Sequence, residues 1–184
     1  MDLGFDGASM GEIARSAGVS KGTLYVYFAD KNALFEAIVE EEALEKGQVE
    51  FNLSPGRDAT TTLLEFGKTY IAMLCRPGGG SAIRTVMAVA ERMPDVGRRY
   101  YASVLEKTID RLAAYLEARV KAGELAIDDC QHAASQFMLM CQASLFLPFV
   151  FQAAPPPSPE RIAQVIESAT RMFLAGYRTE SGLT

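Results

Sequence analysis

Apolar side chains recur at three- and four-residue spacing along most of this chain, and glycine or proline separates one such run from the next. This spacing places apolar residues on one face of a helix, whereas the strict alternation typical of a half-buried strand is found in no segment. No internal repeat is present either. The sequence therefore predicts an all-α fold.

The break at Leu53-Ser54-Pro55-Gly56 divides the chain into two predicted units. Residues 1–53 contain short helical runs, and residues 54–184 contain longer ones, expected at 57–75, in a shorter segment before Pro94, at 101–120, at 128–151 and at 159–177. A chain of 184 residues, of which 49% are hydrophobic, is long enough for a helical domain with a substantial core plus a small appended module.

The net charge of −5 and the pI near 5.0 count against a nucleic-acid partner unless the basic residues are segregated. The acidic stretch from Glu40 to Glu45 lies more than two helical turns beyond Lys31, so we expect it to point away from a basic surface around that lysine. We interpret this stretch as an ordinary solvated helix face and not as an acidic binding site for a partner.

Three cysteines lie in apolar helical stretches, and their odd number does not suit a disulfide framework; they are Cys75, Cys130 and Cys141. We expect them to be reduced and the protein to be cytoplasmic. The first residues lack the basic and apolar regions of a secretory signal. The apolar run at residues 137–151 is shorter than the ~20 residues of a membrane span and is interrupted by Gln142 and Pro148, so a buried helix and no membrane partner are expected.

The N-terminal segment contains the start and stop signals of three helices. Ser9 and Glu12 have the spacing of a capping box, and Gly18 can adopt the left-handed conformation that ends a helix. Ser20 is the predicted N-cap of a second short helix, and Asp30 that of a third, which is expected to continue to about residue 51. Three side chains are expected to point inward: Val19, Leu24 and Phe28. Two short helices joined by a glycine-containing turn are typical of the helix-turn-helix.

The string at residues 13–34, IARSAGVSKGTLYVYFADKNAL, resembles the DNA-binding signature of the TetR family. The resemblance covers the first fifty residues closely, and the remainder matches only in its pattern of helices. Met93-Pro94-Asp95 followed by Tyr100-Tyr101 resembles the AefR-like branch. The resemblance implies a transcriptional regulator, most often a ligand-inducible repressor, that binds a palindromic operator in double-stranded DNA as a homodimer. It also implies an N-terminal helix-turn-helix domain and a C-terminal helical domain for ligand binding and dimerisation.

Carried over residue by residue, the resemblance assigns DNA contacts to eight positions. Lys21, Gly22 and Thr23 would face base edges or the adjacent backbone; Tyr25, Tyr27 and Lys31 would contact phosphates; and Ser9 and Ser20 are candidate hydroxyl donors. The competing interpretation makes Tyr25 a core aromatic residue and Lys31 a solvated charge. Family members also open with a helix before residues 4–7, so we expect either a start missing from this sequence or an incomplete DNA-binding domain.

The larger unit supplies aromatic and thioether side chains suited to an adaptable apolar pocket. The candidates are Phe66, Tyr70, Met73, Met87, Tyr101, Met138, Met140 and Phe146. For any single one of them plain core packing is the better explanation. The pocket as a whole rests on the family resemblance, which implies an inducer held between these helices. Only three scattered polar residues, Arg84, Glu91 and Gln142, accompany these side chains. We therefore expect an apolar or aromatic small-molecule inducer.

The helices at residues 128–151 and 159–177 have more apolar surface than one neighbour can cover, which predicts a homodimer through them. No enzyme chemistry is indicated. Cys130 and His132 lie on different helix faces, so no metal site is expected, and Gly78-Gly79-Gly80 lacks the lysine of a phosphate loop, so no cofactor is expected. One alternative remains: a dimeric small-molecule-binding helical protein whose helix-turn-helix no longer functions.

Overall fold

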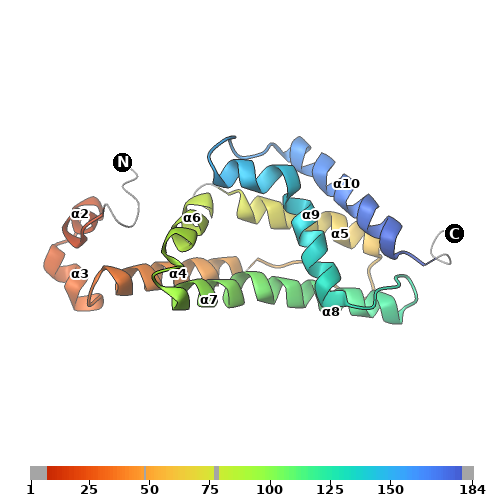
Figure 1. Ribbon diagram of the computed structural model, residues 1–184, viewed down its shortest axis with the longest axis horizontal. Helices are drawn as coiled ribbons and strands as arrows, with labels where there is room; N and C mark the ends of the chain where they lie inside the picture. Colours follow the sequence, from red (N-terminus) through yellow and green to blue (C-terminus); the bar gives the residue numbers. More distant parts are fainter. Residues whose placement is uncertain (1–7, 48, 77–78, 180–184) are drawn as a thin grey trace.

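The computed structural model describes residues 8–47, 49–76 and 79–179 (Figure 1). Within these ranges every regular element of secondary structure is a helix, and the only strand-like pairing is an isolated bridge between Leu125 and Arg178. The predicted all-α fold is confirmed.

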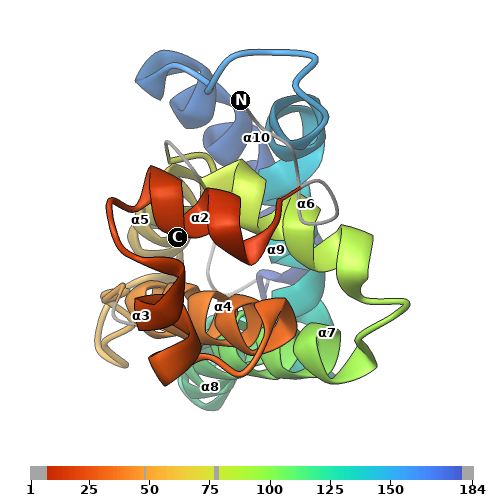
Figure 2. The same cartoon turned by 90° about the vertical axis from the view of Figure 1, so that its left-hand side faces the viewer.

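Three helices form the N-terminal part: α2 (Met10–Ser16), α3 (Lys21–Tyr27) and α4 (Lys31–Gly47). Figure 1 shows α2 and α3 at one end of the molecule, with α4 leading from them into the rest of the fold. Figure 2 looks at the molecule from this end, where α2 and α3 lie in front of the other helices. The short helices are therefore held at the extremity of an elongated molecule.

The remaining helices form the larger part. They are α5 (Ala59–Leu74), α6 (Gly79–Val89), α7 (Pro94–Tyr100), the π-helical turn η1 (Tyr101–Glu106), α8 (Lys107–Lys121), α9 (Cys130–Val150) and α10 (Pro159–Tyr177). The backbone stays helical from α7 through η1 into α8, so these three make one long rod. The sequence predicted that rod only from residue 101, because Pro94 was interpreted as a break, whereas proline occupies the first helical turn without loss of a hydrogen bond.

Side-chain caps define where several of these helices begin. Asp58, Asp129 and Ser158 each accept a hydrogen bond from the backbone N–H three residues later, which satisfies a donor that has no partner within the helix. Gly123 follows α8 with a φ of 77°, a conformation that most other residues resist. Local sequence thus fixes these ends.

The core lies where α5, α8, α9 and α10 meet. Phe66 of α5 contacts the rings of Phe51, Tyr70 and Phe137, with centroids 4.6, 5.8 and 6.2 Å away. Phe137 in turn meets Phe173 of α10 at 5.2 Å. All five rings are at least 90% buried, so this aromatic chain links helices that are distant in sequence.

Two helices differ from their predicted course. The helix expected to reach residue 51 ends at Gly47, and Phe51 leaves the helical path to pack on Phe66. The helix expected at 128–151 begins at Cys130, and its backbone departs from helical geometry at Ala143 (φ 8°, ψ −104°), five residues before Pro148. Proline has no N–H to donate to the preceding turn, which favours a kink here.

α9 has 21 residues and is long and apolar enough to cross a membrane by length and composition alone. It packs against α5, α6, α8 and α10, and 44% of its most apolar window is buried. These contacts are those of a core helix.

Gly67 of α5 marks the closest approach between helices, and it generates a stability prediction. A Cβ at this position would lie 2.7 Å from Ile166 Cγ2 and 3.2 Å from Cys141 Sγ. We expect Gly67→Ala to lower the free energy of unfolding by about 1–2 kcal/mol, because overpacking outweighs the gain in helix propensity. Gly176→Ala is the control, since no atom lies within 4 Å of its added Cβ, and it should be stabilising by about 0.5–1 kcal/mol. Urea denaturation followed by circular dichroism measures both; equal stabilisation would contradict the packing described.

Candidate nucleic-acid interface

The turn between α2 and α3 is built by local hydrogen bonds. Ser9 Oγ accepts from the Glu12 N–H at 3.2 Å, and Glu12 Oε2 accepts from the Ser9 N–H at 2.9 Å, so the predicted capping box is confirmed. The hydrogen bonds from Ser9 lower the pKa of the Glu12 carboxyl. Gly18 has a φ of 69°, as its predicted role requires. Because the Ser9 hydroxyl also lies 2.7 Å from Glu12 Oε2, to which it donates, its hydrogen is already engaged.

α3 contains no buried residue. Lys21, Gly22 and Thr23 at its start are exposed, and so are Tyr25 and Tyr27, at 47% and 75%. The interpretation of Tyr25 as a core aromatic residue therefore does not fit the structure. A helix with five predicted contact residues on its surface can approach a duplex without rearrangement.

Two contacts organise the exposed side of α3. Ser20 Oγ accepts from the Thr23 N–H at 3.0 Å and lies 2.8 Å from Thr23 Oγ1. Since two hydroxyls sharing one hydrogen bond retain a second hydrogen, this pair keeps one donor for an outside acceptor. Lys21 Nζ lies 5.7 Å from the centroid of the Tyr25 ring, within cation-π range.

Lys31 differs from the other predicted contacts because it is half-buried. Its Nζ donates to the backbone oxygen of Ala8 at 3.0 Å, which connects the start of α4 to the residue before the capping box. Sequence reasoning missed this contact, which joins residues 23 positions apart. Lys31 thus has a structural contact in addition to the phosphate contact that the family signature predicts for it.

The charge on this end of the molecule differs in sign from that of the whole chain. Residues 8–31 contain three basic side chains, Arg15, Lys21 and Lys31, against two acidic ones, Glu12 and Asp30. Both carboxylates accept backbone hydrogen bonds as helix caps. Of the acidic stretch predicted to face away, Glu41 is exposed, and the side chains of Glu40, Glu42 and Glu45 lie outside the described residues.

The inward-pointing residues of this region are less covered than predicted. Leu24 and Phe28 are half-buried, and Val19 is 40% exposed at the tip of the turn. The prediction for Val19 was wrong, because this residue lies in the short turn between the C-cap of α2, Ala17, and the N-cap of α3, Ser20. The helix expected before residues 4–7 lies outside the described residues.

The predicted pocket residues separate into two groups. Phe66, Tyr70, Met73, Met138 and Phe146 are buried and Met140 is half-buried, whereas Met87 and Tyr101 are 62% and 51% exposed. Burial raises the pKa of the Tyr70 hydroxyl, which accepts a hydrogen bond from Gln142 Nε2 at 2.7 Å. Met140 lines a groove between α9 and α10, away from the other buried members. The structure thus brings five of the eight into the core and leaves two on the surface.

Arg84, one of the polar residues expected to contact a ligand, is hydrogen-bonded within the protein. Arg84 donates to the Val150 carbonyl at the end of α9, at 3.0 Å. Cys75 and Cys141 are buried free thiols, and burial raises the pKa of Cys75 to about 11. Among the described residues, no three His, Cys, Asp or Glu side chains group in a way that could hold a metal ion.

Comparison with known proteins identifies the class. A profile described as "AefR-like transcriptional repressor, C-terminal domain" matches residues 61–179, more than half of the chain, and one described as "Bacterial regulatory proteins, tetR family" matches residues 2–38. The chain therefore belongs to the TetR family, with an AefR-like C-terminal domain. It is a helix-turn-helix transcriptional regulator and not an enzyme.

Individual relatives agree over nearly the whole length. The Flavonoid-responsive Regulator FrrA is 33% identical, with a TM-score of 0.75 over 96% of this chain and 90% of that one. A TetR family regulator from Pseudomonas syringae is 28% identical, with a TM-score of 0.77 over 96% and 89%. The HTH-type transcriptional regulator YhgD of Bacillus subtilis is 24% identical over 180 residues, which cover 90% of this chain and 85% of YhgD.

Substitutions at Ser20 separate its capping role from its predicted place on the DNA-contact surface. Ser20→Ala removes the acceptor for the Thr23 N–H, which should cost about 1 kcal/mol locally and speed amide hydrogen exchange at Thr23. Ser20→Asn should restore protection. Ser20→Asp should also restore it, yet weaken DNA binding, because a carboxylate then faces phosphates. Equal DNA affinity for the Asn and Asp variants would contradict this placement of Ser20.

Proposed function

We propose that this protein is a ligand-responsive repressor that binds a palindromic operator as a homodimer in the cytoplasm. The observation that carries the proposal is the exposure of Lys21, Gly22 and Thr23, the first residues of α3, which is a helix without a buried residue. Ammonium and hydroxyl donors at this position suit base edges in the major groove, and the small glycine permits close approach.

Phosphate contacts come from the flanks of α3. Tyr25 and Tyr27 present their rings to solvent, and Arg15 is exposed on α2. Such contacts fix register on the duplex without reading sequence. The eight residues assigned from the family signature are all on α3 or at its two flanking helix starts, which supports a single continuous interface.

Exposed apolar residues on the last two helices support the dimer. Leu139 and Leu147 of α9 are 65% and 54% exposed, and Met172 of α10 is 59% exposed. Between the two helices lies a groove of about 320 Å³ lined in part by Met140, Val165 and Met172. Pairing α9 and α10 with their copies would form a four-helix interface, which needs to bury more than ~1,000 Å² to be stable.

The ligand proposed is an apolar or aromatic small molecule held among the middle helices. The buried aromatic chain from Phe51 to Phe173 supports this chemistry, and FrrA, a relative of 33% identity, is named as flavonoid-responsive. Binding there would lower operator affinity only if it favoured a different position of α3.

α4 is the element that would transmit the change. Glu36 of α4 pairs with Arg99 of α7 at 3.0 Å. Arg111 of α8 donates to the Val49 carbonyl at 3.2 Å, and its guanidinium lies 5.3 Å from the Phe51 ring centroid. A ligand that moved α7 or α8 would therefore pull on α4 and displace α3.

The proposal is tested by footprinting the full chain on the promoter region beside its own gene, with and without flavone as a probe ligand. We expect protection of an inverted repeat that flavone or another member of an apolar panel releases. A chain that binds such compounds and protects no DNA would instead be a small-molecule-binding protein with a non-functional helix-turn-helix.

Lys21 and Lys31 should affect DNA binding in different ways. Lys21→Ala should reduce the preference for operator over scrambled duplex by about 10-fold, because one base contact contributes ~1–3 kcal/mol. Lys31→Met should weaken both duplexes alike and reduce the salt slope by about one. Fluorescence anisotropy across a salt series measures both effects. Equal loss on both duplexes for Lys21→Ala would contradict its role in reading bases.

The dimer generates a separate prediction. Leu139→Glu combined with Met172→Glu places charges in the proposed interface and should give a monomer at micromolar concentration. Met87→Glu is the matched control, because Met87 is 62% exposed on α6, outside the two helices of the proposed interface, and should leave the dimer intact. Light scattering distinguishes the species; a parent chain that is monomeric would refute the dimer.

A further inference from the structure

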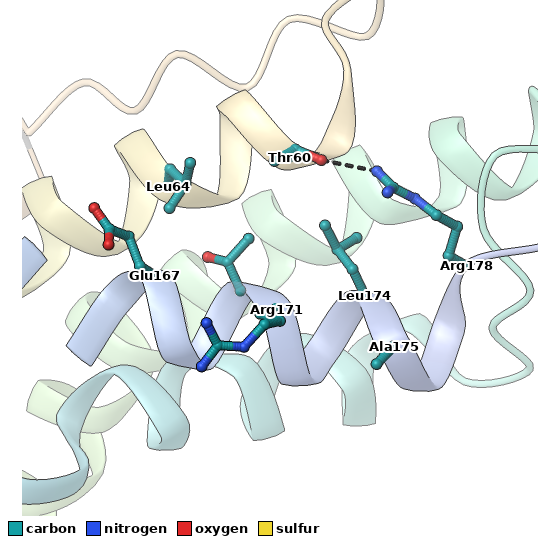
Figure 3. Close-up of a pocket in the computed structure, with 8 residues that line it drawn as sticks. Thr60, Leu64, Glu167, Arg171, Leu174, Ala175 and Arg178 are labelled. Carbon is teal, nitrogen blue, oxygen red and sulfur yellow. Dashed lines mark hydrogen bonds between the residues drawn. The ribbon is translucent and has the colours of Figure 1, made fainter. Parts of the chain in front are cut away.

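A second hollow of the larger domain lies between α5 and α10, apart from the aromatic core. It encloses about 420 Å³, a size suited to a small organic molecule. The residues that line it are Thr60, Leu64, Glu167, Thr170, Arg171, Leu174, Ala175 and Arg178, and Figure 3 shows Leu174 and Arg178 directed from the α10 side toward α5. The groove near Met172 lies instead between α9 and α10.

Two polar atoms in this pocket lack the partner that buried polar groups normally have. Thr170 is 2% exposed, and its Oγ1 has no hydrogen-bond partner among the described residues. Arg178 donates from its Nη2 to Thr60 Oγ1 at 2.8 Å, yet its buried Nε has no acceptor in the same part of the chain. Both groups can donate to an acceptor, which reaches these buried atoms once the side chains around them move aside.

The charges of the pocket favour an anion. Arg171 and Arg178 supply two positive charges against the single carboxylate of Glu167, and Figure 3 shows Arg178, just after α10, reaching toward Thr60 while Arg171 points the other way. A guanidinium binds a carboxylate through directed N–H donors and does so more strongly than it binds a neutral acceptor. The remaining lining, formed by Leu64, Leu174 and Ala175, is apolar.

From these observations we propose that the pocket between α5 and α10 binds a small amphipathic carboxylate, an aliphatic or aromatic acid. Its carboxylate accepts hydrogen bonds from Thr170 Oγ1 and Arg178 Nε, and its apolar body lies against Leu64 and Leu174. This site is additional to the ligand site among the middle helices. α5 also belongs to the aromatic core through Phe66 and Tyr70. The occupant of the pocket therefore contacts a helix that a ligand in the core would also contact.

The test uses octanoate as the probe and octan-1-ol as its neutral counterpart, titrated into the full-length protein by calorimetry. We expect saturable binding of octanoate and at least about 10-fold weaker binding of the alcohol, because hydrogen bonds to a charged group are the stronger ones. Methyl resonances of Leu64 and Leu174 should shift with octanoate. Absence of binding, or equal binding of both compounds, would overturn the proposal.

Three variants locate the carboxylate. Thr170→Val keeps the shape of the side chain and removes its unpartnered hydroxyl, so the fold should be at least as stable while octanoate binds about 10-fold more weakly. Arg178→Met should weaken binding by a similar factor or more. Lys107→Met removes one exposed positive charge on α8 outside the pocket, and it should leave binding unchanged. Octanoate affinity that is insensitive to both pocket variants would refute the assignment.

The competing occupant of this surface is a second copy of the chain. Arg171 is exposed on α10 and would be covered if the partner reached this side of the helix. Arg171→Met should therefore weaken octanoate binding and leave the dimer dissociation constant unchanged. A shift in dimerisation without a change in octanoate affinity would make the pocket part of the dimer interface and overturn the proposal. Operator binding, measured without octanoate on the same samples, reports separately on the proposed repressor function.

Discussion

The position of α3 depends on α4, because α3 itself contributes no buried residue. Its caps and the Gly18 turn fix its shape but not its place relative to the rest of the molecule. That place is set where α4 packs onto α7 and η1, through the burial of Phe35 in the core and the ion pair of Glu36 with Arg99. An exposed ion pair alone holds little free energy, so the apolar contacts must supply most of the attachment.

The larger domain is suited to receive and transmit a signal because its helices share one core. Gly67 lets α5 lie close to Ile166 of α10 and Cys141 of α9, and the aromatic chain through Phe66 extends this packing to the segment after α4. Tightly packed interiors do not deform continuously, so a ligand among these helices would shift whole elements. α9, although apolar enough for a membrane span, packs against four other helices of this core.

How much of this could be predicted from sequence depended on the range of the interactions. The capping box of Ser9 and Glu12, the Gly18 turn and the exposure of Lys21 to Thr23 follow from residues within four positions of one another, and they were predicted. The end of α4 was not, because Phe51 leaves the helix for a partner on α5. The bond from Lys31 to Ala8, the exposure of Met87 and the pocket beside Arg178 likewise depend on contacts between distant segments, which helical periodicity alone does not encode.

The central claim, that contacts of α4 with the larger domain fix the two recognition helices of a dimer, is tested most directly by a distance. Spin labels at Ser16→Cys, in a chain where the half-buried Cys130 is replaced by serine, report the separation between the two DNA-binding ends by pulsed electron paramagnetic resonance; the buried Cys75 and Cys141 should remain unlabelled. On operator DNA we expect a narrow distribution, since the recognition helices must sit about 34–36 Å apart. In the free protein, Phe35→Ala combined with Arg99→Met, which removes both the buried apolar contact and the ion pair of α4, should broaden it. A distribution as narrow as that of the parent would contradict the claim.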